Sequence, residues 1–310
     1  MLPNCSKRGK TKVVGSMDVK PGFGTSNAND RNVAQRVLGS DELVESLRAF
    51  VANSAGNEID SQKAIKPDLS DFKLFDEPLV GFARFDDPLF DDLAKPGIVG
   101  PGMLRPADWL PGAQTVVSYF LPFTQRVRSS NIASDVASLE WLHGRIEGQA
   151  FVLEVDAYVV SLLESAGYGA VCPALDSRMS IHYMDDSDLN DTFYSNWSEH
   201  HVAYVAGLGT FSLSKGLITE RGMAGRFGSV VTTASFEPTP RSYEGIYDNC
   251  IRCGACVEQC PIGAITLEHG KDHVKCFKVV SDSKRRFPGY YGCGKCQVGV
   301  PCEHANPARG

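Results

Sequence analysis

The feature that most constrains this 310-residue chain is the crowding of its cysteines near one end. Eight of the ten cysteines fall between Cys250 and Cys302, which leaves only Cys5 and Cys172 elsewhere. A disulfide framework is typical of small secreted domains, and the first twenty residues lack the apolar block of a secretion signal. We therefore expect the clustered cysteines to hold a metal group.

The first half of the cysteine segment follows a regular spacing. Residues 250–261 read C-x2-C-x2-C-x3-C-P, with thiols at Cys250, Cys253, Cys256 and Cys260. This is the spacing of bacterial 4Fe-4S ferredoxins, in which three thiolates hold one cluster and the fourth reaches a second one. Zinc is the competing interpretation, because C-x2-C pairs also bind it. Four zinc ligands would leave the third regularly spaced cysteine and the C-P pair unexplained.

The second half of the segment supplies four more cysteines, enough for a second cluster. They are Cys276, Cys293, Cys296 and Cys302. The crossed arrangement of two-cluster ferredoxins predicts two ligand sets, namely Cys250, Cys253, Cys256 with Cys302, and Cys276, Cys293, Cys296 with Cys260. The step from Cys296 to Cys302 is an irregular C-x5-C, so a single cluster with spare cysteines stays open as the alternative.

Composition places the chain among ordinary globular proteins. It is 43% apolar and 22% charged, with a net charge of -6, which excludes collagen-like, coiled-coil and wholly disordered chains. No apolar run approaches the roughly 20 residues that span a bilayer, so we expect a cytoplasmic protein without a membrane segment. The mild acidity argues against broad nucleic-acid binding.

The chain divides into three parts by pattern. Residues 1–40 are rich in Gly, Asn, Ser and Lys without a hydrophobic period, which predicts a loosely ordered arm. Residues 41–240 mix strand and helix patterns and predict an α/β (α+β) domain with a mixed sheet. Residues 241–310 predict a ferredoxin-like domain with two 4Fe-4S clusters.

Several elements of the middle part can be predicted individually. Helices are expected from residue 40, over 136–166 and over 197–206, and strands over 115–121, 170–173, 216–219 and 227–232. The strand at 115–121 is apolar on both faces, as in the centre of a sheet. Residues 56–112, rich in Asp-Pro and Pro-Gly pairs, predict strands and turns rather than helices. Gly144 and Gly148 inside the long helix indicate close packing there or are simply tolerated.

Three short motifs ahead of the cysteines resemble those of one family. They are Ala206-Gly207-Leu208-Gly209, Gly216-Leu217-Ile218-Thr219 and Arg226-Phe227-Gly228-Ser229. With the double-cluster module behind them, they resemble epoxyqueuosine reductases and their relatives, the reductive dehalogenases. The run Tyr291-Gly292-Cys293-x2-Cys296-Gln297 is similar to the second cluster motif of this family, and the likeness covers about residues 119–302.

The resemblance implies a base-off cobalamin between the α/β domain and the ferredoxin domain, reduced to Co(I) by the nearer cluster. It assigns corrin contacts to Gly207, Leu208, Gly209, Gly216, Leu217, Ile218 and Arg226. Glycines would let the backbone approach a flat macrocycle, whereas the alternative is a pair of tight turns.

The resemblance also implies a proton donor. Asp176 lies where the family carries its general acid, and burial beside a corrin would raise its pKa. The alternative role for Asp176 is a helix N-cap. Tyr119, Tyr183 and Tyr194 are rival donors. His200 and His201 could ligate a metal, and Trp197 with Tyr204 could stack on a corrin, but such residues equally fit a buried helix face.

The leading hypothesis is a reductase that resembles epoxyqueuosine reductase, with two 4Fe-4S clusters, cobalamin and an unassigned small-molecule or modified-nucleoside substrate. An external low-potential donor of the ferredoxin or flavodoxin type would supply its electrons. One alternative is a cobalamin-free ferredoxin-type electron-transfer protein for a partner enzyme, and another is a shortened tRNA epoxyqueuosine reductase. The family's helical-repeat domain does not follow the clusters here. Its absence, the charge and the scarcity of basic groups (Arg126, Arg128 and residues 284–286) argue against tRNA.

Overall fold

The computed structural model describes residues 37–182 and 194–309. These described residues belong to one compact unit, whose first helix is α1 (Ser40–Asn53). The N-terminal arm lies outside the described residues apart from 37–40, so the expectation of a loosely ordered arm stays a prediction. The boundary expected at residue 240 stays a prediction as well.

A four-stranded sheet forms the centre of this unit, in the order β3-β4-β10-β5. Its strands are β3 (Leu79–Arg84), β4 (Thr115–Pro122), β5 (Ala170–Val171) and β10 (Gly225–Thr232). All three pairings are antiparallel, and β4 and β10 pair along their full lengths, from Thr115 opposite Thr232 to Pro122 opposite Gly225. The α+β class is confirmed, but the sheet is antiparallel where we expected a mixed one.

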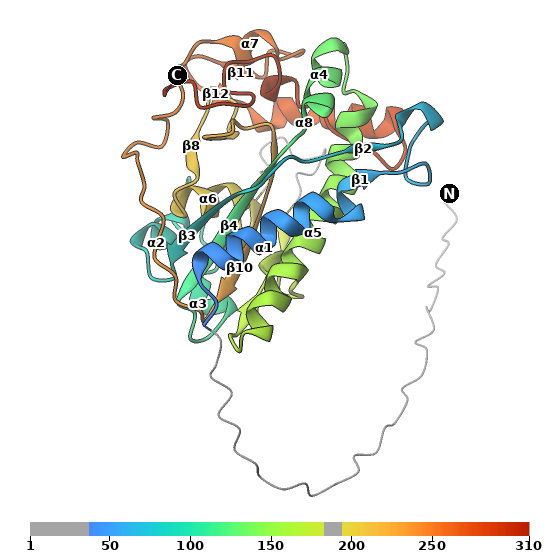
Figure 1. Cartoon of the computed structure of the whole chain (residues 1–310). Coiled ribbons are helices and arrows are strands. Elements are labelled where there is room, and N and C mark those ends of the chain that lie inside the picture. Colours follow the sequence, from blue (N-terminus) through green and yellow to red (C-terminus); the bar gives the residue numbers. More distant parts are fainter. Residues whose placement is uncertain (1–36, 183–193, 310) are drawn as a thin grey trace, which may run out of the picture. The chain divides into compact units, whose positions relative to one another are not determined.

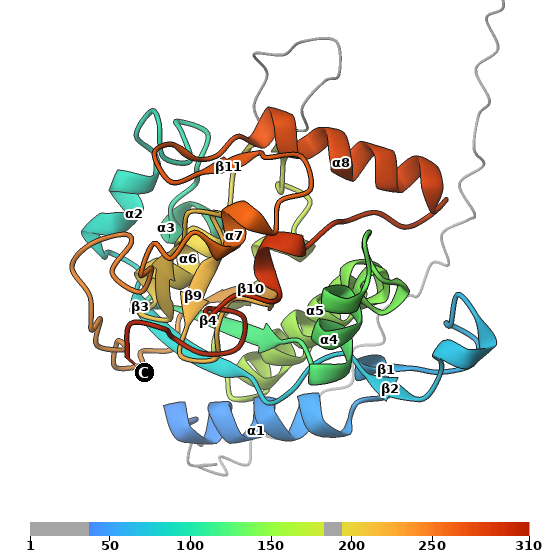
Figure 2. The same ribbon diagram turned by 90° about the horizontal axis from the view of Figure 1, so that it is seen from above.

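Strand β4 is buried on both faces, as its unbroken apolar sequence predicted. Val117 and Tyr119 belong to the core on the side of α5 (Leu139–Ser165), while Val116 and Phe120 belong to the core on the side of α6 (Glu199–Val205). Figures 1 and 2 show the sheet between these two helices, with α1 lying against α5. The unit is therefore layered as helix, sheet and helix.

Helix α5 begins three residues later than the hydrophobic period suggested. The Ser138 side chain accepts a hydrogen bond from the Trp141 amide at 3.1 Å, which fixes the start of the helix. Past its end, Gly167 adopts a positive φ of 87°, as expected of a residue that stops a helix. A Cβ on Gly144 would lie 2.7 Å from the Phe123 ring, so close packing explains this glycine.

Residues 56–112 contain helices that we did not expect. Asp87 caps α2 (Pro88–Leu93) through the Leu89 amide, and α3 (Pro106–Trp109) also begins with proline. Proline fits the first helical position because its missing N–H is unneeded there. The assignment of this region to strands and turns was thus wrong at Asp87-Pro88 and Arg105-Pro106, where a proline starts a helix.

The remaining elements are short and surround this framework. They are η1 (Ala55–Asn57), β1 (Glu58–Ile59), η2 (Pro67–Leu69), β2 (Phe72–Lys73), α4 (Gln125–Ala133), η3 (Pro173–Leu175), β6 (Ile181–His182), β7 (Tyr194–Ser195), β8 (Gly209–Phe211), β9 (Leu217–Thr219), α7 (Ala255–Glu258), β11 (Ile265–Thr266), β12 (Gly270–Lys271), α8 (His273–Arg286) and η4 (Lys295–Gln297). In Figure 1, α7 and α8 lie at the top of the unit, above the strands of the central sheet.

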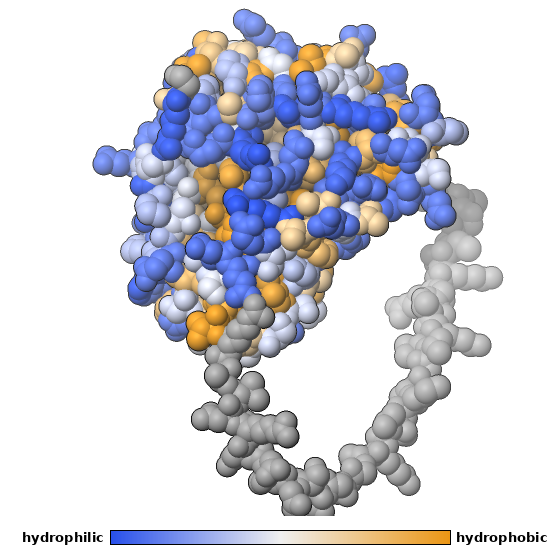
Figure 3. Space-filling view, viewed as in Figure 1, coloured by the Kyte–Doolittle hydropathy of each residue, from blue (hydrophilic) through white to orange (hydrophobic). Residues whose placement is uncertain are grey.

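The surface is mainly polar on the face in view. Figure 3 shows hydrophilic residues over most of this face, with apolar patches between them. Among the described residues, no helix is long and apolar enough to cross a membrane.

One buried polar group stands out in the core. The Tyr119 hydroxyl oxygen lies 2.7 Å from Asp156 Oδ1 and 2.9 Å from the Val152 carbonyl oxygen. One hydroxyl proton cannot serve both acceptors, so both contacts are hydrogen bonds only if Asp156 is protonated. Burial raises the pKa of Asp156 from 3.8 to about 7, against the hydrogen bonds of Tyr119 and Cys172.

We predict that Asp156→Asn flattens the pH dependence of stability. With a raised pKa in the folded state, the stability linked to Asp156 is fully present below its unfolded pKa of 3.8 and is lost as the pH rises to about 7. The neutral amide avoids that loss, so melting temperatures from pH 4 to 8 should decline less than in the native protein. Asp68→Asn, at an exposed aspartate, should leave the profile unchanged. Parallel profiles for Asp156→Asn and the native protein would contradict this.

Candidate functional site

Four cysteines line a cavity of about 210 Å³ between the cysteine-rich segment and the sheet. They are Cys260, Cys276, Cys293 and Cys296. We call this the inner set, because its cavity is also bordered by residues of α5, α6 and β10. It is the set that the crossed arrangement predicted around Cys260.

The other four cysteines line a second, smaller cavity of about 20 Å³. They are Cys250, Cys253, Cys256 and Cys302, and we call them the outer set, since Cys253 is exposed. Cys302, whose spacing was irregular, reaches this cavity with the three cysteines of the C-x2-C-x2-C run. The nine described cysteines are all free of disulfides.

Left-handed backbone positions shape the cysteine loops. Gly254 has a φ of 82° and precedes α7, the short helix that carries Cys256. Gly294 has a φ of 69°, and a Cβ there would lie 2.0 Å from the Trp141 ring. Only glycine combines that backbone with such close contact. Gly294 therefore lets the loop that carries Cys293 and Cys296 approach α5 closely at Trp141.

The cysteine-rich segment is fastened to the rest of the fold by buried polar contacts. Arg128 of α4 pairs with Glu303 at 2.8 Å, and their side chains are only 13% and 10% exposed. The Glu303 carbonyl accepts from the Ala224 amide, and the Cys302 carbonyl accepts from the Met223 amide at 3.0 Å. The outer set thus depends on a junction beside the start of β10.

The sulfur donor atoms of both cysteine sets suit iron–sulfur clusters. Thiolates are the ligands of 4Fe-4S clusters, and each cavity is bordered by four of them. Among the described residues, no three His, Cys, Asp or Glu side chains converge closely enough to hold a single metal ion. A cluster fills the space between its thiolates, so four cysteines around a cavity suit it.

The inner cavity is strongly cationic. Its lining includes Arg145, Arg226, Lys271 and Lys295. Burial lowers the pKa of Lys271, but the thiolates of the inner set raise it, and the net shift is upward. The pKa of Arg226 falls to about 9 because of burial and of repulsion from Arg145.

The residues expected to contact a corrin lie mostly in a tight hairpin of β8 and β9. A Cβ on Gly209 would lie 2.0 Å from the Ile218 carbonyl oxygen, and one on Gly216 would lie 2.8 Å from Met223 Sδ. Gly207 has a φ of 81°, and its Cβ would meet Thr239 at 3.1 Å. The glycines are thus explained by the chain's own packing. Leu208, Leu217 and Ile218 are buried in the cores, and of the seven residues only Arg226 borders the inner cavity.

A corrin does not fit either cavity. Pockets for drug-sized ligands measure about 300–1,000 Å³, and a corrin is larger than such ligands. The two cavities, of about 210 and 20 Å³, are smaller than that and are each lined by four cysteines. Neither of these two cavities therefore supports a cobalamin site.

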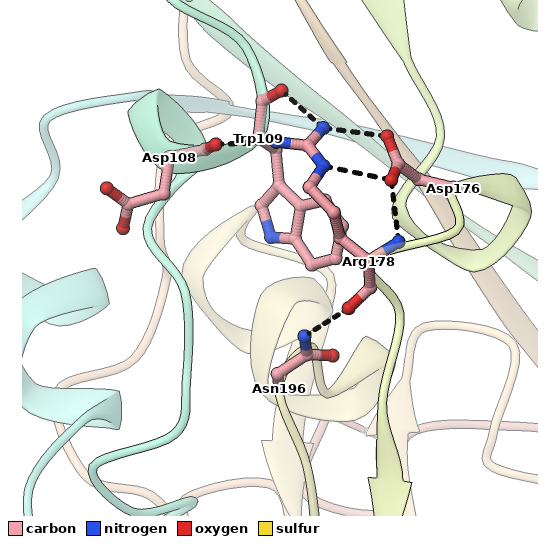
Figure 4. A network of polar contacts seen from close by, with 5 residues as sticks. All are labelled: Asp108, Trp109, Asp176, Arg178 and Asn196. Atoms are coloured by element: carbon pink, nitrogen blue, oxygen red, sulfur yellow. Dashed lines mark hydrogen bonds and ion pairs between the residues drawn. The ribbon is translucent and has the colours of Figure 1, made fainter.

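Asp176 lies in a polar network rather than beside the cavities, as Figure 4 shows. Its carboxylate accepts from the Arg178 guanidinium at 2.7 and 2.9 Å and from the Arg178 amide at 2.8 Å. These bonds lower the pKa of Asp176 to about 2. We expected burial to raise this pKa, and the ion pair reverses its direction. The general-acid role stays a prediction, and Asp176 ends η3 rather than capping the start of a helix.

Arg178 holds this network together. Its guanidinium donates to the Asp108 and Trp109 carbonyls, each at 2.8 Å, and lies 5.0 Å from the centre of the Trp109 ring. The Arg178 carbonyl accepts from the Asn196 amide group. The segment after η3 is therefore tied to α3 and to β7.

The other candidate donors and ligands are dispersed. His200 borders the inner cavity, where burial lowers its pKa to about 3, whereas His201 bonds to Ser198 Oγ at 2.7 Å. The two rings thus do not share a ligand site. Tyr119 is buried in the core, and Tyr194 is exposed. Tyr183 lies outside the described residues.

Trp197 belongs to the core, while Tyr204 packs on Tyr243. Trp197 Nε1 donates to Ser229 Oγ at 2.9 Å, which satisfies its one polar atom. Both residues are accounted for by packing.

The comparison with known families agrees with the cysteine chemistry. Residues 243–266 match the family model described as a 4Fe-4S binding domain. With the fold and the two sets of thiols, this match defines the class: the chain is an iron–sulfur protein.

Two similar proteins carry the name of the family that the sequence motifs resemble. The chain is similar to an epoxyqueuosine reductase of Bacillus cereus, with 22% identity over 62% of this chain and 49% of the relative. It is also similar to an epoxyqueuosine reductase of Bacillus anthracis, with 29% identity over 34% of this chain and 29% of the relative. The chain spans about half the length of the first relative and less of the second. The resemblance seen in the motifs is confirmed.

A solved structure shares the fold. A reductive dehalogenase, described as suggesting a mechanism for B12-dependent dehalogenation, matches with a TM-score of 0.51 and 16% identity. The match covers 91% of this chain and 35% of the dehalogenase. The likeness concerns the fold alone.

We predict that Arg128→Met lowers the free energy of unfolding by about 3 kcal/mol, because it leaves the buried Glu303 carboxylate without its cation. Thermal and chemical unfolding of the anaerobically purified protein would measure this. Arg126→Met is the matched control on the same helix, since exposed Arg126 only stacks on Phe72 and should cost less than about 1 kcal/mol. Equal losses for both variants would refute the importance of the pair.

Proposed function

We propose that this chain is an iron–sulfur oxidoreductase of the epoxyqueuosine reductase type, with one 4Fe-4S cluster on each cysteine set. The observation that carries the proposal is the division of eight cysteines between two cavities, four by four. That division follows the crossed pairing of two-cluster ferredoxins. The match of residues 243–266 to a 4Fe-4S binding domain supports it.

The two sets suit different tasks in electron transfer. The outer set includes exposed Cys253, so its cluster would accept electrons from an external low-potential donor of the ferredoxin or flavodoxin type. The inner set borders His200 and Arg226 of the α+β part, so its cluster would deliver electrons there. Each cluster carries one electron at a time, so a two-electron reduction takes two transfers. The substrate would be a small molecule or a modified nucleoside, and the location would be the cytoplasm.

The resemblance to this family also implies that the chain binds cobalamin. It is supported by the fold shared with a reductive dehalogenase linked to B12-dependent dehalogenation. The small size of both cavities stands against it. We therefore assign no residue and no step to cobalamin.

The cavity sizes favour one second candidate, a cobalamin-free electron-transfer protein that serves a partner enzyme. Added cobalamin separates the two candidates, because only a corrinoid reductase should take it up stoichiometrically during anaerobic reconstitution. A tRNA substrate is not supported by the basic groups on α4, since Arg128 is paired with Glu303 and Arg126 stacks on Phe72. The basic residues that are left as possible phosphate contacts are the exposed Lys284, Arg285 and Arg286 at the end of α8.

We predict about eight irons and eight sulfides per chain after anaerobic purification. Cys253→Ser and Cys276→Ser should each reduce the iron content to about four, because each removes a ligand from a different set. Cys5→Ser, outside the cysteine-rich segment, should retain eight. Four irons in the native protein would contradict two clusters, and stoichiometric zinc would refute the iron–sulfur assignment.

A further inference from the structure

We propose that a collar of four cations makes the inner cluster easier to reduce than the outer one. The collar consists of Arg145, Arg226, Lys271 and Lys295, which all line the inner cavity. The inference rests on the proposed function, since it requires a cluster on each set. It adds the residues that set the direction of electron flow.

The collar residues come from four separate elements. Arg145 lies on α5, Arg226 on β10, Lys271 on β12 and Lys295 on η4. No Asp or Glu of residues 37–182 or 194–309 lines the cavity, and none of the four cations is ion-paired with a described carboxylate. The four positive charges are therefore left to interact with whatever occupies the cavity.

The hydrogen-bond partners of Arg226 and Lys295 are neutral, and the carboxylate of Asp135 interacts electrostatically with Lys295 without an ion pair. Arg226 donates to the Gln149 side-chain oxygen, and Lys295 donates to the Asn131 and Ser134 carbonyls. The Arg145 guanidinium stacks 5.0 Å from the centre of the Tyr291 ring, and its buried Nε has no hydrogen-bond partner. These contacts orient the cations without neutralising them.

The outer cavity has a different lining. Arg252 is its one cation among the described residues, and its guanidinium donates to the Leu267 carbonyl at 2.7 Å. The rest of the lining, apart from the cysteines, is mainly apolar, as at Leu213, Ile218 and Val300. The count of lining cations is thus four against one.

We expect nearby charge to decide which cluster has the higher reduction potential, because the two cysteine sets do not differ clearly in solvent exposure. Reduction adds a negative charge to a cluster, so nearby cations favour it and burial disfavours it. The outer set has one exposed cysteine, Cys253, and two that are only 8% exposed, Cys256 and Cys302. All four inner cysteines are half-buried. The collar therefore gives the inner cluster the higher potential, and electrons run downhill from the outer cluster to the inner one.

The test is a redox titration of the intact, anaerobically purified protein, followed by electron paramagnetic resonance. Cys253→Ser and Cys276→Ser, each with one cluster left, assign the two signals. In the native protein, the inner cluster should have the higher midpoint potential. Lys271→Gln should make its reduction roughly tenfold less favourable, a shift of about 59 mV to lower potential, and leave the outer cluster unchanged.

Two further variants make the test specific. Lys271→Arg keeps the charge and should keep the native potential, while Arg226→Gln should repeat the downward shift if Lys271→Gln fails to fold. Lys278→Gln is the matched control, because this exposed lysine lies on α8 near Cys276 but outside the cavity lining.

The collar would be refuted if the two clusters had equal midpoint potentials or if the inner cluster had the lower one. It would also be refuted if the midpoint potential of the inner cluster stayed unchanged in both Lys271→Gln and Arg226→Gln. Iron analysis of the native protein comes first and separates the two ideas. Four irons would refute the two-cluster function itself, whereas eight irons with equal potentials would refute the collar alone.

Discussion

The antiparallel pairing of β4 with β10 is the constraint on which the rest of the structure depends. Strand β4 is buried along the whole pairing and β10 from Phe227 onward, with α5 packed on one face and α6 on the other. At one end of this pairing, Gly225 lies opposite Pro122 and Arg226 opposite Leu121, and both Gly225 and Arg226 border the inner cavity. The sheet that forms the core therefore also fixes where the cysteine-rich segment meets the larger part of the fold.

The junction between the cysteine-rich segment and the larger part of the fold depends on particular close contacts and not only on the surface area buried there. Gly294 touches Trp141 of α5, and Gly222 approaches the Glu303 backbone so closely that a Cβ would lie 2.3 Å from its carbonyl oxygen. With the buried Arg128–Glu303 pair, these contacts hold both cysteine sets against rigid elements. Electron transfer benefits from such rigidity, because fixed positions need little rearrangement when charge moves.

The sequence could predict what depends on short-range spacing. Two-sided burial of β4 and the length of α5 followed from apolar patterns. Cys302 lines one cavity with Cys250, Cys253 and Cys256, and its role as a cluster ligand stays a prediction. Spacing could not show that Arg178 turns back onto Asp176 and lowers its pKa. Nor could it show that Arg145 and Lys271, 126 residues apart, line one cavity, because tertiary folding alone brings them together.

The two cysteine sets are interleaved along the chain. Cys256 and Cys260 are separated by one turn, yet they belong to different cavities, and Cys302 returns past the inner set to complete the outer one. The short turn from Cys256 to Cys260 is therefore shared by both cysteine sets, and a backbone change within it would act on both cavities at once.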